Sequence, residues 1–245
     1  MFFILPWFDC SRYSKNEPRG ILIIAIGSMQ LPEGCTWMTA ERLLRLNGDL
    51  GDPERSGLMD VIRRFHSFCH AHDLSYCVIG GMAVVRDGAP RTTANVDILT
   101  LKKEWTRLLP LEGELRSTGI DTCVDTESGV KIDILFAEDD WGMVMPMPDP
   151  RTAGEYDEKA RAFFMGLHDL VQLKMAVYLS KLTEYGKATA AKDLGDVYAL
   201  IKNNPPKFSN EVFSRYHSAL RDHCLEVYEE VLRSENGSGK RQRNT

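Results

Sequence analysis

Three polar side chains stand where two short apolar runs of the sequence allow them to meet. Asn95 and Asp97 open the run NVDILTL, and Asp133 stands in the middle of VKIDILF. Side chains alternate between the two faces of a β-strand, so Asn95 and Asp97 share a face, and Asp133 can join them from a neighbouring strand. Converging oxygens of this kind hold Mg²⁺, and metal ions can stabilise the attacking and leaving oxygens of a phosphoryl transfer. The pattern therefore predicts a magnesium site for phosphoryl chemistry.

Two consecutive glycines, Gly80 and Gly81, precede these polar residues and suit the binding of a phosphate. They end the β-type run SYCVIGG, and MAVVRDG can begin a helix directly after them. Because glycine has no side chain, backbone N–H groups at such a helix start can approach a phosphate closely. A glycine turn or a strand aspartate is a weak signal alone, and it is their order along the chain that indicates a nucleotide site.

A single lysine interrupts an apolar helical run further along the chain. Lys174 is the only charged residue in LVQLKMAVYLS. A lysine in such a stripe either extends its ammonium group to solvent or meets an anion, and the glycine turn together with Asp97 favours a bound phosphate. Lys192 and Asp193 follow in another helix. They lie either on a solvated face or at a functional site, since Asp193 shares a helix face with apolar residues.

The elements that must position these residues form an α/β half followed by a helical half. Periodic apolar residues predict a helix over about residues 53–72, before the strand, glycine turn and helix around Gly80. The first half then continues with a strand over NVDILTL, a helix-capable stretch over 102–118 and two strands joined as a hairpin at 127–129. After a loop over 141–156, helices are expected over 164–182, 188–203 and 209–233. The expected fold class is therefore α/β (α+β), with a small mixed sheet flanked by helices and a helical C-terminal half.

Changes in composition divide the chain into four parts. Residues 1–37 show no clear period before MTAERLL, so we expect an N-terminal appendage, or a mis-assigned start with translation beginning at Met38. The α/β domain is expected over 38–140 and the helical domain over 141–233. Residues 234–245 lack apolar side chains and are expected to be disordered.

Composition restricts the classes of function. The chain has 245 residues, of which 43% are hydrophobic and 27% charged, as in an ordinary globular protein. The formal charge of −5 argues against a protein that holds nucleic acid by a general basic surface, so nucleic acid is favoured as a substrate rather than a scaffold. Six scattered cysteines indicate reduced thiols and a cytoplasmic location. The apolar runs near the start are shorter than the roughly 18–20 residues of a membrane-spanning helix, so no membrane association is expected.

The chain resembles the nucleotidyltransferase superfamily, and among its branches the AbiEii-type toxin and related bacterial nucleotidyltransferases. The resemblance is carried, over roughly residues 60–203, by IGGMAVVRDGAPRTTANVDIL, VKIDILF, LHDLVQLKMAVYL and KDLGDVYALI. It implies the nucleotidyltransferase fold, with Mg²⁺ and a nucleoside triphosphate as cofactors. For a toxin-like role it also implies an antitoxin partner.

The resemblance implies a role for each matching position. It implies phosphate contacts for Gly80 and Gly81, metal binding for Asn95, Asp97 and Asp133, and a nucleotide pocket lined by Lys174, Lys192 and Asp193. Arg91 and Thr93 match the arginine and threonine that precede the metal pair. We therefore predict catalytic roles for Asp97, Asp133, Lys174 and Asp193, and nucleotide binding by Gly80, Gly81, Arg91, Thr93, Lys174 and Lys192.

Asn95 departs from the pattern, which has a carboxylate at that position. Its amide oxygen can still coordinate a metal, but the site has one negative charge fewer, so we expect weaker Mg²⁺ binding and less neutralisation in the transition state. Three outcomes follow: Asp97 and Asp133 suffice for activity, the chain is a nucleotide-binding relic, or another carboxylate such as Asp125 or Asp87 is recruited.

Three hypotheses for function remain open at this point. The first is Mg²⁺-dependent transfer of a nucleoside monophosphate from a nucleoside triphosphate to an acceptor hydroxyl, with Asp133 as metal ligand and base. The acceptor is an RNA end, a protein or a small molecule. The second is a non-catalytic module that binds a nucleotide or a partner, and the third is a structural α/β domain without a ligand.

Overall fold

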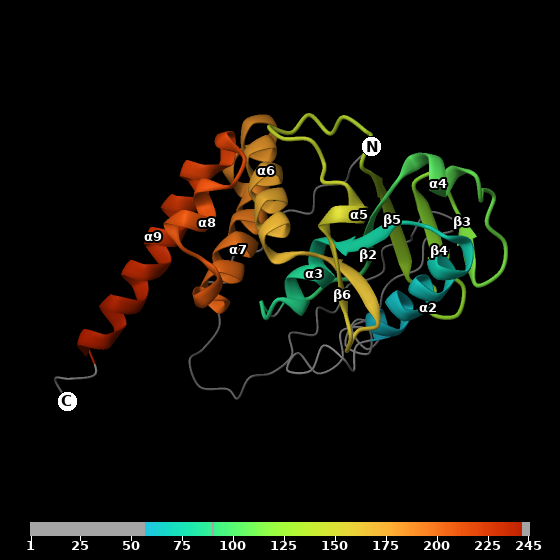
Figure 1. The fold of residues 1–245 in the computed structure, drawn as a ribbon, viewed down its shortest axis with the longest axis horizontal. Helices are drawn as coiled ribbons and strands as arrows, with labels where there is room; N and C mark the ends of the chain where they lie inside the picture. The colour runs from blue at the N-terminus through green and yellow to red at the C-terminus, as the bar shows by residue number, and fades with distance from the viewer. Residues whose placement is uncertain (1–56, 90, 242–245) are drawn as a thin grey trace, which may run out of the picture. The chain divides into compact units, whose positions relative to one another are not determined.

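The computed structural model describes residues 57–89 and 91–241, and its helices and strands are shown in Figure 1. The helices are α2 (Gly57–His72), α3 (Gly80–Arg86), α4 (Lys102–Thr106), α5 (Pro150–Ala153), α6 (Leu167–Tyr185), α7 (Lys187–Asn203), α8 (Asn210–Ser214) and α9 (Ser218–Arg241), with a 3-10 turn, η2, at Pro205–Lys207. The strands are β1 (Tyr76–Ile79), β2 (Val96–Thr100), β3 (Leu115–Ser117), β4 (Thr122–Asp125), β5 (Lys131–Phe136), β6 (Gly154–Asp157) and β7 (Ala162–Met165). The expectations for residues 1–37, and for a helix start near residue 53, lie outside the described residues.

The strands form one mixed sheet in the order β3-β4-β5-β2-β1-β7-β6. The pairs β2 with β5 and β1 with β7 are parallel, and the remaining neighbours are antiparallel. The hairpin of β4 and β5 and the strand, glycine turn and helix from β1 to α3 are confirmed. The structure thus confirms a mixed sheet followed by a helical C-terminal half.

Burial explains why these segments form the centre of the sheet. All four residues of β1 are buried, and in β2 every residue except Asp97 is buried. In β5 buried and more exposed residues alternate, as expected for a strand with one face in the core. Helix α2 packs its buried apolar face against β2 and β7, and α3 packs against β1 and β2. Strands β1 and β2 are therefore held by helices as well as by their neighbours in the sheet.

A buried ion pair ties α2 to the sheet. Arg64 of α2 donates to Asp125 of β4 through Nε and Nη2, at 2.8 Å and 2.7 Å. Burial alone would raise the pKa of Asp125, but hydrogen bonds from Arg64 and Ser128 outweigh it and lower the pKa below 3.8. The Asp125 carboxylate therefore has a structural role, in which it joins α2 to β4.

The helical half is built around α6. Helix α6 packs against α7 and α9, and α7 also packs against α9. In Figure 1 these helices, coloured from orange to red, lie beside one another. None of the described helices is both long enough and apolar enough to cross a membrane.

Several segments differ from the sequence prediction. The helix-capable stretch 102–118 contains only the short α4 and then β3, because Pro110 interrupts a helix and Leu115–Ser117 pairs with β4. The predicted loop over 141–156 contains α5 and most of β6. Strand β7 pairs with β1, so the sheet continues past the expected boundary at residue 140.

The last predicted helix is divided. The segment 209–233 forms α8 and α9, which a short turn at 215–217 separates. Helix α9 continues to Arg241, beyond the point at which the sequence predicts disorder.

Candidate active site

The turn between β1 and α3 brings the backbone against Asp97. Gly80 has a φ of +61°, a conformation that glycine adopts far more readily than other residues. The strand register places Ile79 opposite Asp97, and a Cβ atom added to Gly80 would lie 2.0 Å from Asp97 Oδ2. Gly81 is also closely backed, because an added Cβ would lie 2.7 Å from Thr93 Oγ1. Both glycines are therefore required by the packing of the polar residues behind them.

The structure brings the three predicted polar residues together. The parallel pairing of β2 and β5 places Asp97 directly opposite Asp133. The Nδ2 atom of Asn95 donates to Asp97 Oδ1 at 2.9 Å and to Asp133 Oδ2 at 2.7 Å. One oxygen of each carboxylate thus points to a common position, where the Asn95 amide lies.

Burial disfavours the ionised form of Asp97. It raises the pKa of Asp97 above 3.8, and the charge of Asp133 raises it further. A hydrogen bond from the Gly81 N–H, together with the charges of Lys174 and Arg91, opposes this effect. On the other carboxylate, Asp133 Oδ1 lies 2.6 Å from the ammonium group of Lys131.

The donor set fits a magnesium ion that is shared with a substrate. Among the described residues there is no group of three or more His, Cys, Asp or Glu side chains that could hold a metal without help. Mg²⁺ is, however, usually bound by one or two carboxylates together with water and substrate phosphates. Two carboxylates whose oxygens converge on one position, as those of Asp97 and Asp133 do, satisfy this requirement.

Helices α6 and α7 carry a chain of alternating charges. Lys174 Nζ lies 3.2 Å from Asp193 Oδ1 and 2.8 Å from Asp196 Oδ2. Asp193 also pairs with Lys181 at 2.7 Å, and Asp196 pairs with Arg91 at 2.6 Å. The sequence left two possibilities for Lys174, an ammonium group in solvent or one that contacts an anion. The ammonium group contacts anions, and these are the carboxylates of Asp193 and Asp196. Three cations thus share two carboxylates in this group of ion pairs.

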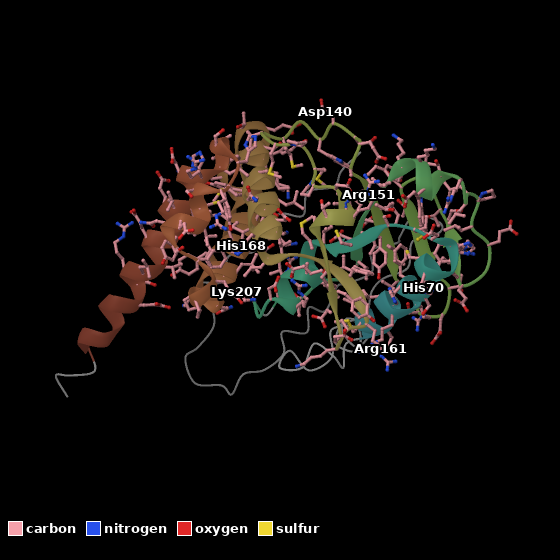
Figure 2. All side chains as sticks on the ribbon, viewed as in Figure 1. His70, Asp140, Arg151, Arg161, His168 and Lys207 are labelled. Atoms are coloured by element: carbon pink, nitrogen blue, oxygen red, sulfur yellow. The ribbon has the colours of Figure 1, made fainter. Side chains whose placement is uncertain are left out.

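A cavity of about 360 Å³ connects the two groups of charges. Its polar lining consists of Gly80, Asp97, Lys174, Ser180, Lys181 and Asp193. Its apolar lining consists of Ile79, Leu135, Trp141, Met143, Met147, Leu173 and Val177. Three of these apolar residues come from the segment between β5 and α5, where Asp140, labelled in Figure 2, also lies. The cavity is therefore polar at its charged ends and apolar along its wall.

The lining of this cavity does not include the other predicted nucleotide-binding residues, which are Gly81, Arg91, Thr93 and Lys192. Arg91 and Thr93 lie behind Gly81, and the Thr93 hydroxyl donates to the backbone carbonyl of Asn95 at 3.3 Å. Lys192 is exposed, and partial removal of its ammonium group from water, with repulsion by Arg91 and Lys174, lowers its pKa.

Sequence reasoning missed Lys181 and the apolar wall. Lys181 follows Lys174 by seven residues, which is two turns of a helix, so the spacing alone places both lysines on one face. The wall residues Trp141, Met143 and Met147 lie outside any helix or strand, and no periodicity marks them.

Neither of the carboxylates considered as a replacement for Asn95 reaches the site. Asp125 is bound by Arg64, and its side chain is fully buried. Asp87 follows the last residue of α3, the end opposite Gly80, where Arg86 Nη2 donates to it at 2.9 Å and 3.0 Å. Recruitment of Asp125 or Asp87 is therefore wrong, because both are committed elsewhere.

Comparisons with known proteins found similarity among solved structures. No protein-family model matches it, and no curated protein matches it significantly. Among solved structures it is similar to an antigenic nucleotidyltransferase-like protein from Paracoccidioides brasiliensis, with 19% identity, a TM-score of 0.43 and coverage of 59% of this chain and 75% of that one. It is also similar to ANT(2")-Ia in complex with adenylyl-2"-tobramycin, with 10% identity, a TM-score of 0.42 and coverage of 71% and 99%.

Proposed function

We propose that the chain binds a nucleoside triphosphate in this cavity and transfers its nucleoside monophosphate to an acceptor hydroxyl in a Mg²⁺-dependent reaction. The observation that carries the proposal is the placement of Asp97 and Lys174 on the lining of one cavity, with Asp133 and Asn95 converging on Asp97. A carboxylate for a cation and lysines for phosphates are then supplied to the same space.

The lysines bind the polyphosphate in this proposal. Lys174 and Lys181 line the cavity, and each is held by Asp193. Asp193 therefore acts as a positioning residue that orients two ammonium groups, rather than as a group that reacts. The apolar wall around Trp141 and Met143 receives the base or sugar, since such surfaces commonly line ligand pockets.

Asp97 and Asp133 are the residues that would hold Mg²⁺. The ion would supply neutralisation of the charge that develops on the transferred phosphoryl group and the leaving pyrophosphate. The Asp133 side chain is 26% exposed, so an acceptor hydroxyl can reach it and pass its proton to this carboxylate. Asn95 adds no charge to the pair, so the site neutralises less than one with three carboxylates.

A second candidate function is nucleotide binding without turnover. The observation in its favour is the amide of Asn95, which lies between the two carboxylates and donates to both. The two functions share the phosphate-binding lysines and differ in whether a cation joins them.

Transfer of label from a triphosphate tests the proposed reaction. The purified protein is incubated with Mg²⁺, nucleoside triphosphates labelled at the α-phosphate, and either total RNA, protein or small hydroxyl acceptors. We expect label on one acceptor class, none when the label is at the γ-phosphate, and none in EDTA. RNA as the acceptor, and inhibition by an antitoxin protein, would match the toxin-type resemblance. Nucleotide binding without label on any acceptor class would instead support the second candidate.

Replacement of Lys174 by methionine tests the phosphate-binding end. We expect triphosphate binding to weaken by about 10- to 100-fold, because a charge-assisted hydrogen bond to phosphate contributes roughly 1.5–3 kcal/mol. The fold should persist, since Asp193 keeps Lys181 and Asp196 keeps Arg91. Calorimetry in EDTA measures the affinity, and the exposed Lys187→Met is the matched control. Equal affinities for the two variants would remove Lys174 from the site.

A further inference from the structure

The chain itself supplies hydrogen-bond donors to both carboxylates of the proposed cation site. Asp97 accepts from Asn95 Nδ2 and from the Gly81 N–H. Asp133 accepts from Asn95 Nδ2 at Oδ2 and pairs with Lys131 Nζ at Oδ1. In the free protein, therefore, both carboxylates already accept hydrogen bonds without a metal ion, and Asp133 is also ion-paired.

The orientation of the Asn95 amide follows from its neighbours. A carboxylate only accepts hydrogen bonds, so the NH₂ group, with its two hydrogens, must face Asp97 and Asp133. The amide oxygen then lies on the other side, where the Thr93 hydroxyl approaches it at 3.4 Å. A cation between the carboxylates would meet the positive end of the amide instead of an oxygen.

We propose that Asn95 closes the cation site of the free protein, so that the divalent cation binds only together with a polyphosphate. This inference rests on the proposed function, because it concerns regulation of the same site. Asn95 and Lys131 already occupy oxygens of the two carboxylates, so few remain for a cation. A polyphosphate brings additional anionic oxygens that can bind it. The resident amide is the element that has to move.

Rotation of the Asn95 amide about its terminal torsion opens the cation site without a steric clash from the exchange of its nitrogen and oxygen. The nitrogen and oxygen of an asparagine side chain are nearly equal in size, and the torsion that exchanges them has a broad, roughly two-fold profile. Turning the amide by half a revolution replaces the NH₂ group with the carbonyl oxygen, which is an acceptable ligand for Mg²⁺. Asn95 is thus a conditional gate, and a carboxylate at this position would be a permanent ligand.

Binding of Mn²⁺ to three proteins in the absence of nucleotide tests the gate. Electron paramagnetic resonance reports free Mn²⁺ during titration of the wild type, Asn95→Ala and Asn95→Asp. Asn95→Ala removes the amide without adding a charge, so we expect it to bind Mn²⁺ about tenfold or more tightly than the wild type. Asn95→Asp should bind more tightly still. With a non-hydrolysable ATP analogue, the wild type should bind Mn²⁺ and the difference from Asn95→Ala should disappear.

The alanine variant decides between the gate and an ordinary ligand. If the Asn95 oxygen were a resident ligand, Asn95→Ala would bind Mn²⁺ more weakly than the wild type, and this result would overturn the inference. Equally tight Mn²⁺ binding by the wild type with and without the analogue would overturn it too. Chemical denaturation confirms that each variant is folded. Absence of label transfer would refute the proposed reaction. The Mn²⁺ comparison would still test whether Asn95 closes the cation site.

Discussion

Asp97→Asn is expected to lower nucleotidyl transfer by about a thousandfold, the scale of losing one strong electrostatic stabiliser of a transition state. The substitution removes one of only two negative charges that converge on the proposed cation position. Asparagine has nearly the same shape, and its oxygen can still accept from the Gly81 N–H, so the fold should persist. Transfer of α-label to the acceptor measures the effect.

The control for this substitution is Asp139→Asn, the same change in a surface ion pair with Lys102. It should leave transfer unchanged, and a loss comparable to that of Asp97→Asn would show that the assay reports general instability. The wild-type pH profile gives a second measurement. Asp97 must be ionised to hold a cation, and burial raises its pKa, so activity should rise with pH along a limb above 3.8.

Gly80→Ala is expected to destabilise the protein by about 3 kcal/mol or more and to abolish transfer. Two causes combine: the left-handed backbone at φ +61° disfavours alanine, and its Cβ would lie 2.0 Å from Asp97 Oδ2. Relief of this clash requires the Asp97 side chain to move from the place where it contacts Asn95. Denaturant unfolding and the transfer assay measure the two losses separately.

Two other glycines separate the causes. Gly186 also has a positive φ, +81°, with ψ 176°, but nothing lies within 4 Å of an added Cβ, so Gly186→Ala should show the backbone cost alone, roughly 1–3 kcal/mol. Gly195 lies inside α7 with open space around it, and Gly195→Ala should stabilise by roughly 0.5–1 kcal/mol. A Gly80→Ala protein as stable as Gly186→Ala would contradict the close packing on Asp97.

The central part of the site could be predicted from the sequence because it depends on local periodicity. The two-residue period of a strand places Asn95 and Asp97 on one face, and the apolar runs around them make adjacent buried strands. The turn at Gly80 is likewise a local signal. Contacts between these segments then follow from the sheet itself.

The remainder depends on contacts between distant segments, which no periodicity reports. Lys174 and Asp193 are 19 residues apart and meet because α6 and α7 pack together. Strand β7 was missed because its four residues become a strand only by pairing with β1 and β6. The hydrogen bonds of Asn95 were also unpredictable, since the sequence does not say whether its amide oxygen or its NH₂ group faces the carboxylates.

The position of β1 limits how ligands can enter and leave. It lies between β2, which carries Asp97, and β7, which continues through Gly166 into α6 with Lys174. A hinge that separated these two side chains would have to break the backbone pairing of β1 with β2 or with β7. The segment between Phe136 and Pro150, which contributes Trp141, Met143 and Met147 to the lining, is not paired in this way. Exchange of substrate and product should therefore be gated by this methionine-bearing loop, with release following its mobility rather than a swing of whole domains.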